Sequence, residues 1–315
     1  MKHSFRTVDL DRLVEFWNQF YPSRYRIDVD LLRTHTVDSP TFDWGASCVE
    51  EADGEILAFV LVKKSPASLY AGSDRDVAHL SAIGYCDANY GVDMLSDLKQ
   101  LLRNRGCNRL TFGQDSLHFF PGCPEDFPQL TSFLMVEGFG DGGVACDLER
   151  DLGDYENTFK DPDGDEFRVV EAKDVRALEA FLTREFPGRW RYDVMSKVKI
   201  DGPGCVVALF HGDQIDGFAL IQGETNKVPV GGAVWRNDLG EHWGSLGPIG
   251  VSKALRGKGS GHALLGNALA ELRKRGARQS IIDWTGLLDF YGRHGFVVTR
   301  RYHYMALSLS EPTQN

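Results

Sequence analysis

Residues 256–261 read Arg-Gly-Lys-Gly-Ser-Gly and directly precede ALLGNALAEL, an apolar run with helical spacing. Glycines let the backbone approach a ligand closely, and the first turn of a helix carries N–H groups that have no intrahelical acceptor. Together with the helix dipole, such N–H groups bind anions, usually phosphate. The segment therefore predicts either a phosphate-binding loop or a glycine-rich turn that only caps the helix.

Spacing separates this loop from two widespread phosphate loops. A Walker loop requires G-x-x-x-x-G-K-[ST], but the residue five positions before Gly257 is Ser252. A dinucleotide-binding loop requires G-x-G-x-x-G and an acidic residue on the next strand. The glycines here alternate instead, so a nicotinamide oxidoreductase, with Asp283 as its acidic residue, is only a distant alternative.

Composition narrows the class of protein. The chain has 315 residues, of which 42% are hydrophobic, and a formal net charge of −10. This charge disfavours nucleic-acid binding and mildly favours a cationic partner such as an amine. The sequence shows no secretory signal and no apolar run near the ~18–20 residues of a membrane helix. Six cysteines without a C-x-x-C pair predict a reduced, cytoplasmic protein with no metal site.

The chain also repeats itself, with the motifs in the same order in both halves. YPSRYRID at 21–28 resembles FPGRWRYD at 186–193, and LSAIGY at 80–85 resembles LGPIGV at 246–251. Further pairs are LLRNRGC at 101–107 with ELRKRGA at 271–277, and VEGF at 136–139 with RHGF at 293–296. We therefore predict two copies of one domain, at residues 1–153 and 165–315, joined by the polar stretch 154–166.

The copies differ at the glycine loop. The offset between them is 166 residues at IGY/IGV and 170 at RNRG/RKRG, so the first copy lacks four residues where the second has the loop. The first copy offers only ANYGVDML at 88–95, with one glycine, no cation and an aspartate that we expect near the helix start. A phosphate site is therefore predicted in the second copy alone.

The elements that position the loop follow from hydrophobic periodicity. In the second copy we expect an α/β (α+β) fold, a mixed sheet flanked by helices. Helices are expected over residues 175–184, from residue 263 onward, and over 287–293. Strands are expected over residues 167–170, in two runs within 205–222, and over 243–251, 279–285 and 296–309.

With strand, loop and helix in this order, residues 256–261 resemble the R/Q-x-x-G-x-G/A loop of the GNAT superfamily of N-acetyltransferases. FYGRHGF at 290–296 resembles the second motif of that family, although Trp284 stands near the place of its usual asparagine. The resemblance implies two tandem GNAT folds, each a mixed, mostly antiparallel twisted sheet flanked by helices. The first of them is expected to be degenerate and to help build the acceptor cleft. The resemblance implies acetyl-CoA as cofactor, with the pyrophosphate on the loop and the pantetheine arm on the preceding strand. The implied cofactor-binding residues are Ile249, Gly250, Val251, Arg256, Gly257, Lys258, Gly259, Ser260 and Gly261.

The resemblance also implies catalytic residues. Tyr291 occupies the position of the family's tyrosine acid, and a phenol with a pKa of about 10 can protonate a departing thiolate. The first copy has Leu134 there, so it lacks both the loop and the acid. A backbone N–H near Gly250 or Val251 would polarise the thioester carbonyl. The general base stays open between Asp283, His242 or Glu241, and an ordered water.

Acceptor specificity is expected from residues 185–193, which follow the first helix of the second copy. Trp190 and Tyr192 could form an aromatic wall, with Glu185 or Asp193 facing an ammonium, or these residues could serve the core and a surface ion pair. Residues 118–128 have no counterpart in the second copy and are interpreted as a covering loop without chemistry.

These observations together predict a function. It is transfer of an acetyl group from acetyl-CoA to a primary amine of a small molecule or peptide, by direct attack in a ternary complex. The protein is expected to be a monomer or homodimer that binds neither nucleic acid nor membrane. A non-catalytic acyl-CoA-binding or scaffold protein is the alternative.

Overall fold

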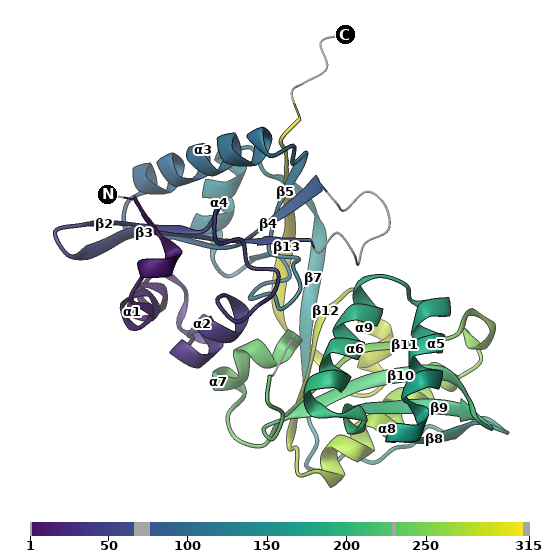
Figure 1. The fold of residues 1–315 in the computed structure, drawn as a ribbon. Helices are drawn as coiled ribbons and strands as arrows, with labels where there is room; N and C mark the ends of the chain where they lie inside the picture. Colours follow the sequence, from purple (N-terminus) through teal and green to yellow (C-terminus); the bar gives the residue numbers. More distant parts are fainter. Residues whose placement is uncertain (1, 66–75, 229–230, 311–315) are drawn as a thin grey trace. The chain divides into compact units, whose positions relative to one another are not determined.

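The computed structural model describes residues 2–65, 76–228 and 231–310 and divides into two compact units (Figure 1). The first unit comprises Met1–Ala145 and Arg300–Asn315, and the second comprises Cys146–Thr299. Each unit is a mixed sheet flanked by helices, which confirms the fold class expected from the sequence. None of the helices in the described residues is long and apolar enough to cross a membrane.

The second unit has the strand order β7-β12-β11-β10-β9-β8. All of these neighbours pair antiparallel except β11 and β12, which are parallel. The strands are β7 (Gly140–Asp151), β8 (Glu166–Val169), β9 (Val206–His211), β10 (Gln214–Gly223), β11 (Trp243–Val251) and β12 (Gln279–Thr285). The helices are α5 (Val175–Glu185), α6 (Arg189–Asp201), α7 (Arg236–Leu239), α8 (Ser260–Lys274) and α9 (Leu288–Gly292).

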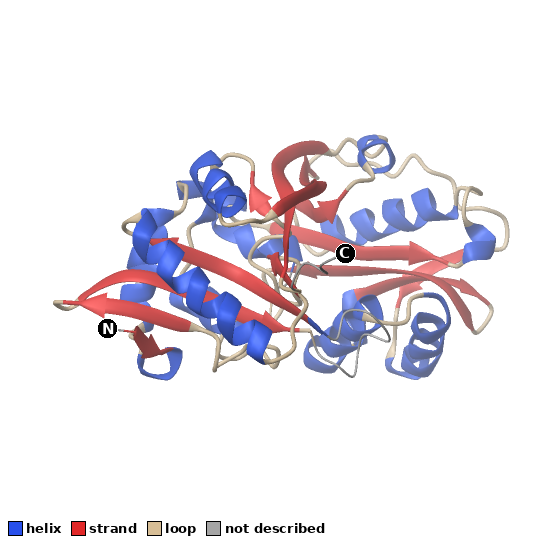
Figure 2. Cartoon of the chain, turned by 90° about the horizontal axis from the view of Figure 1, so that it is seen from above, coloured by secondary structure: helices blue, strands red, loops and turns tan. Residues whose placement is uncertain are grey.

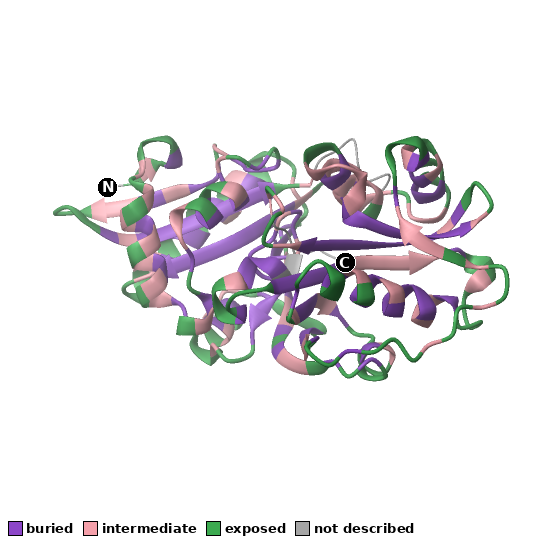
Figure 3. Cartoon of the chain, turned by 90° about the horizontal axis from the view of Figure 1, so that it is seen from below, coloured by how far each residue is buried: buried purple, intermediate pink, exposed green. Residues whose placement is uncertain are grey.

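Helices cover both faces of this sheet because its strands are apolar on both sides (Figure 2). Along β9, Val206, Ala208 and Phe210 pack with the apolar residues of α5 and α6. Val207 points to the opposite face and packs with Leu264 and its neighbours on α8. The strands are mostly buried, whereas the helices alternate between buried and exposed residues (Figure 3).

The first unit repeats this plan. Its sheet order is β1-β2-β3-β4-β5-β13, and β4 and β5 form its parallel pair. The strands are β1 (Lys2–Ser4), β2 (Cys48–Ala52), β3 (Glu55–Lys64), β4 (Val77–Tyr85), β5 (Arg109–Phe112) and β13 (Val297–Ser308), with β6 (Cys123–Pro124) paired to β13. The helices are α1 (Leu10–Phe20), α2 (Val29–His35), α3 (Ala88–Asn104) and α4 (Pro128–Val136).

The compact units are not the two continuous halves that the repeat suggests. Residues 146–151 of β7 pair with β12 in the second unit. Conversely, Met305–Ser308 of β13 pair with β5 in the first unit. Each sheet is thus completed by a strand from the other copy, and the repeat boundaries at 153 and 165 stay a prediction about sequence rather than packing.

Three local expectations need correction. Residues 118–128 are not a surface cover, because Phe119 and Phe120 are fully buried and β6 lies within the segment. Helix α3 begins at Ala88, so the aspartate of ANYGVDML lies in its second turn, and Asp87 caps the helix by accepting the N–H of Asn89. Residues 189–193 form the start of α6, a helix that the sequence reading did not identify.

Candidate active site

Strand β11 has an open edge. It pairs with β12 only at its first three residues, Trp243–Ser245. On its other side it pairs with β10 as far as Val251, with a register shift between Leu246 and Ile249. Such a bulge bends a strand away from its neighbour. Residues 247–251 are partly exposed, and in the described chain no strand pairs with their free edge.

The glycine loop follows this edge and leads into α8. Gly257 and Gly259 have φ values of +75° and +95°, which favour glycine, and no atom lies within 4 Å of a Cβ built on either one. Within the described residues, no intramolecular acceptor binds the N–H groups of Gly257, Gly259, Ser260 or Gly261. Arg256 and Lys258 are exposed. The loop is therefore open, cationic and rich in unused donors, which suits a phosphate.

Tyr291 lies on α9 and is 5% exposed, packed in the core of α8 and β12. Burial and the negative charge of Asp283 raise its pKa well above the usual value of 10, against a hydrogen bond with Thr285 that lowers it. The phenol therefore keeps its proton at neutral pH. A protonated hydroxyl can donate a hydrogen bond to a departing thiolate, and the raised pKa makes full transfer of its proton less favourable.

Asp283 lies near the end of β12, close to the bulge of β11. Its Oδ1 is 3.7 Å from a Cβ built on Gly247, and its charge acts on Tyr291. The structure therefore brings Asp283, Tyr291 and the bulge together. The neighbouring Trp284 has a positive φ of +48°. The guanidinium carbon of Arg189 lies over the Trp284 ring, 4.2 Å from the ring centroid.

His242 is not brought to this place. It precedes the first residue of β11, and its N–H is bound by the carboxylate of Glu224. At 3.3 Å per residue, the strand separates it from Ile249 by roughly 20 Å. Glu241 precedes it by one residue. A role of either residue as general base is therefore inconsistent with the geometry, because the base must reach the attacking amine directly or through one water.

The residues expected to bind the acceptor are not brought together into one pocket wall. Glu185 accepts the N–H of Lys253 over 3.2 Å and the Nε of Arg184 over 3.2 Å, and these bonds lower its pKa, the Lys253 bond most. Trp190 and Tyr192 both lie on α6, where residues two apart point to different sides. They do not form one wall.

Trp190 stacks instead on Phe186, with ring centroids 5.1 Å apart. Asp193 is bound by Arg189 over 3.0 Å. Phe186 was not predicted as a site residue, yet its ring lies 2.5 Å from a Cβ built on Gly250. The signal that would have identified Phe186 is the alignment of YPSRYRID with FPGRWRYD, in which the first copy has Tyr21 at the position of Phe186.

In the first unit the equivalent strand edge is closed. Ile83 of β4 corresponds to Ile249 of β11. The Tyr21 hydroxyl donates to the carbonyl of Ile83 over 2.7 Å and accepts its N–H over 3.3 Å. Phe120 and Phe127 pack around Tyr21, with ring centroids 5.1 Å and 5.7 Å away. In the first unit, the N–H and C=O of Ile83 are therefore hydrogen-bonded within the chain, at the position where the second unit has its open strand edge.

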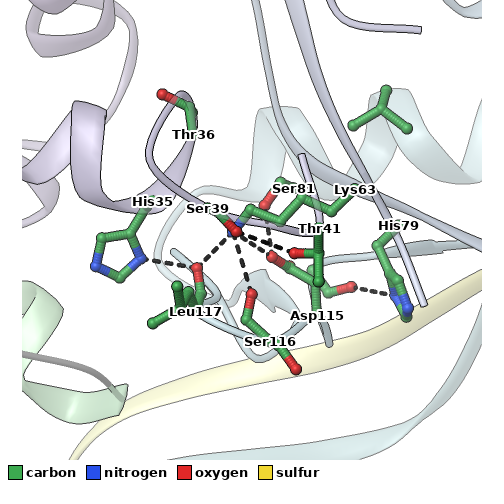
Figure 4. Close-up of polar contacts among 12 residues, drawn as sticks. His35, Thr36, Ser39, Thr41, Lys63, His79, Ser81, Asp115, Ser116 and Leu117 are labelled. Carbon is green, nitrogen blue, oxygen red and sulfur yellow. Dashed lines mark hydrogen bonds and ion pairs between the residues drawn. The ribbon is translucent and has the colours of Figure 1, made fainter. Parts of the chain in front are cut away.

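A buried ion pair lies beside the bulge of the same strand (Figure 4). Lys63 and Asp115 are fully buried and 2.6 Å apart, and the Ser81 hydroxyl donates to Asp115 over 2.9 Å. Ser81 is the bulged residue of β4. Lys63 also donates to the carbonyls of Ser116 and Leu117. The first unit thus fills with its own side chains the region that corresponds to the site of the second.

Comparison with known proteins places the chain among acetyltransferase folds. The family model described as "Acetyltransferase (GNAT) family" matches residues 175–296. A sequence comparison with curated proteins finds no significant match.

Three solved structures show the same fold over the whole chain. The first is a GCN5-related glucosamine N-acetyltransferase region of a fungal multi-domain β-N-acetylglucosaminidase, with a TM-score of 0.84 and 22% identity over 98% of this chain and 38% of that one. The chain thus spans well under half of the fungal protein. The second is a GCN5-related N-acetyltransferase from Sphaerobacter thermophilus, with a TM-score of 0.73 and 16% identity over 100% of this chain and 97% of that one. The third is a tandem GNAT protein from the clavulanic acid biosynthesis pathway, with a TM-score of 0.65 and 13% identity over 96% of this chain and 95% of that one.

Proposed function

Residues 175–296 form a domain of the GNAT acetyltransferase family, and on that premise we propose that the second unit transfers the acetyl group of acetyl-CoA to a primary amine. The observation that carries this proposal is the open edge of β11 at Ile249, followed along the chain by a loop in which four N–H groups have no acceptor among the described residues. The corresponding edge of the first unit is closed by Tyr21, so we propose one cofactor site per chain.

The residues present fit acetyl-CoA. The N–H groups from Gly257 to Gly261 would bind its pyrophosphate, aided by the charges of Arg256 and Lys258. On the edge of 249–251 that does not face β10, backbone groups would pair with the amides of the pantetheine arm, as an added strand would. Acetyl-CoA supplies an activated acetyl thioester to this site.

The residues around the bulge would then promote direct attack by a neutral amine. A backbone N–H at Gly250 or Val251 would stabilise negative charge on the carbonyl oxygen of the thioester. The Tyr291 hydroxyl, which is protonated at neutral pH, would donate a hydrogen bond to the departing sulfur and act as its proton source. Asp283 is our candidate to accept the proton from the amine, directly or through water, since it lies at the bulge.

For the acceptor we propose a small cationic molecule, with amino sugars as the first class to test. The net charge of −10 favours the approach of a cation. The fungal region that shares the fold over 98% of this chain is described as a glucosamine N-acetyltransferase. A peptide amine is the second class. We also propose a reducing, cytoplasmic setting, because all six cysteines are free of disulfides.

Calorimetric titration with acetyl-CoA tests the proposal, with stoichiometry as the first readout. We expect one site per chain, abolished by Gly259→Val because a β-branched residue is strained at a φ of +95° and its methyl groups would fill the loop. Gly276→Val is the matched control. Gly276 has a φ of +98°, no atom lies within 4 Å of its built Cβ, and it follows the other end of α8.

A thiol-release assay with glucosamine, a polyamine and a short peptide then tests for transfer. Acetylation of any of these amines supports the proposal. Stoichiometric binding without turnover on an extended amine panel would favour the non-catalytic acyl-CoA-binding alternative. Absence of binding, or two sites per chain, would contradict the proposal of a single site in the second unit.

A further inference from the structure

The segment that connects the two copies is packed along α8 in the second unit. The Arg273 guanidinium donates to the carbonyls of Gly153 and Tyr155 over 3.0 Å and 2.6 Å. Further toward the start of the helix, Asn267 donates to Asp161 over 2.8 Å. A Cβ built on Gly266 would lie 2.2 Å from the Asn157 side chain, so only glycine permits this contact. The segment is therefore part of the domain that carries the glycine loop.

An aromatic ring of this segment stacks on two histidines at the start of α8. The Phe159 ring lies 5.0 Å from that of His262 and 4.0 Å from that of His294, with interplanar angles of 8° and 17°. Phe290 contacts the His262 ring as well, with centroids 4.6 Å apart. His262 is the third residue of α8 and directly follows Gly261 of the loop. Its ring is therefore held in a fixed orientation beside the predicted phosphate site.

The two histidines belong to a chain of hydrogen bonds that starts in the core. The Tyr155 hydroxyl is 3.4 Å from Nδ1 of His294, and Nε2 of His294 is 3.1 Å from Nδ1 of His262. Burial, with His262 and Arg150 nearby, lowers the pKa of His294 to about 4. Burial and Arg293 also lower the pKa of His262. Both rings are therefore neutral at neutral pH, with one donor and one acceptor each.

The hydrogen-bond directions follow from this neutrality. Burial raises the pKa of Tyr155 to about 12, so its hydroxyl is protonated and donates to Nδ1 of His294. His294 then carries its proton on Nε2 and donates it to Nδ1 of His262. His262 must carry its own proton on Nε2. In the part of the chain that the structure describes, no group is recorded as a partner of this Nε2–H.

We propose that His262 is a cofactor-binding residue, whose Nε2–H donates a hydrogen bond to a phosphate of acetyl-CoA. His294, Tyr155 and Phe159 are positioning residues, which fix the tautomer and the orientation of the ring. This inference rests on the proposed function, because it presumes the cofactor in the loop. In the first copy the aligned positions are Val92 and Glu137, so the pair is confined to the copy that has the loop.

Titration of the full chain with three ligands tests the role of His262. The ligands are acetyl-CoA, its 3′-dephospho form and S-acetyl-pantetheine, which has no phosphate group. We expect His262→Ala to weaken acetyl-CoA binding about tenfold, the loss typical of one hydrogen bond to a charged group, and to leave S-acetyl-pantetheine unaffected. His262→Gln is the conservative variant, because its amide nitrogen replaces Nε2, and we expect it to retain most of the affinity.

The dephospho ligand identifies which phosphate is bound. An equal loss with the dephospho ligand assigns the bond to the pyrophosphate, and a loss confined to acetyl-CoA assigns it to the 3′-phosphate. Both results support the inference. Unchanged binding of acetyl-CoA by His262→Ala, or an equal loss with S-acetyl-pantetheine, overturns it. If the wild-type chain binds no acetyl-CoA at all, the proposed function fails, and the role of His262 fails with it.

Nitrogen-15 NMR of the histidine rings provides a readout that does not depend on activity. We expect both His262 and His294 in the Nε2–H tautomer, with a single set of signals. Tyr155→Phe removes the hydroxyl that fixes the direction of the hydrogen bonds, so we expect mixed tautomers and a smaller, about twofold to fivefold, loss of acetyl-CoA affinity. An Nδ1–H tautomer at His262 in the wild-type chain would overturn the inference.

Discussion

The Tyr21 hydroxyl binds both backbone groups of Ile83, as a donor over 2.7 Å and as an acceptor over 3.3 Å. At the equivalent positions of the second copy, Phe186 and Ile249 cannot form these bonds, because phenylalanine has no hydroxyl. The tyrosine hydroxyl is therefore the difference between a strand edge whose backbone groups are hydrogen-bonded within the chain and one that is available to a ligand.

We predict that Phe186→Tyr weakens acetyl-CoA binding by about tenfold. As Tyr21 does at Ile83, the new hydroxyl would bind the N–H and C=O of Ile249 and compete with the pantetheine arm, at a net value of about 1 kcal/mol for each bond. Calorimetric titration measures the change, and circular dichroism confirms that the variant is folded. An affinity equal to that of the wild type would show that the arm does not use this edge.

The converse substitution, Tyr21→Phe, is expected to reduce stability without creating a second cofactor site. It leaves two buried backbone groups of Ile83 without a partner, at about 1–3 kcal/mol each, so the free energy of unfolding falls by at least about 1 kcal/mol. Urea denaturation measures this loss. Tyr85→Phe is the control, because no hydrogen bond of its hydroxyl occurs in the described residues. A second calorimetric site in Tyr21→Phe would contradict our account of the first unit.

We predict that Tyr291→Phe lowers kcat by about a hundredfold or more while the Kd for acetyl-CoA changes little. The loss follows from removal of a general acid, which contributes about 10²–10⁴-fold in other enzymes. Steady-state kinetics and calorimetry separate the two effects. Tyr85→Phe in the first unit serves as the control, and a kcat of Tyr291→Phe close to that of the wild type would reduce Tyr291 to a core residue.

Breaking the Lys63–Asp115 pair is expected to cost about 3–5 kcal/mol of unfolding free energy, because either single substitution leaves an uncompensated buried charge. Asp115→Asn and Lys63→Met are the variants, measured by urea denaturation. Arg33→Ala breaks an exposed pair with Asp38 and should cost no more than about 1 kcal/mol. A loss from Asp115→Asn as small as that of Arg33→Ala would show that the pair is not rigidly buried.

Stability is expected to fall on acidification below about pH 6.5, before most carboxylates are protonated. Burial lowers the pKa of His35 to about 3 and that of His294 to about 4, from an ordinary value of 6.5. A histidine whose pKa is lower in the folded chain than in the unfolded chain is protonated first in the unfolded chain. Its contribution to the free energy of unfolding is therefore fully present above pH 6.5 and is lost as the pH falls through the pKa of the folded chain. Urea midpoints at pH 8, 6.5 and 5 measure the slope. His294→Gln should make it shallower, and a slope unaffected by substitution at either histidine would contradict the assignment.

Much of the fold and of the loop was already predictable from the amino-acid sequence. Strand β11 was predicted at the residues where it occurs, because alternation and turn residues are local signals. The asymmetry of the glycine loop was predictable as well, since a four-residue deletion appears as a change of offset. These features depend on the order of residues along the chain.

The sequence did not predict how side chains distant along the chain meet. It offered His242 and Asp283 equally as bases. Only the parallel pairing of β11 and β12 separated them, because it places His242 before the start of β11 and Asp283 near the end of the neighbouring β12. It also gave Tyr21 no special role, because its partner Ile83 lies 62 residues away.

Strand exchange between the copies is the clearest feature that tertiary structure alone decided. Residues 146–151 complete the sheet of the second unit, and residues 305–308 complete that of the first. Strands pair through backbone N–H and C=O groups that every residue carries, so a hydrophobic pattern predicts a strand but not the edge it joins. The sequence therefore determined two copies and one glycine loop, whereas packing determined which strands complete each copy and which strand edge stays open.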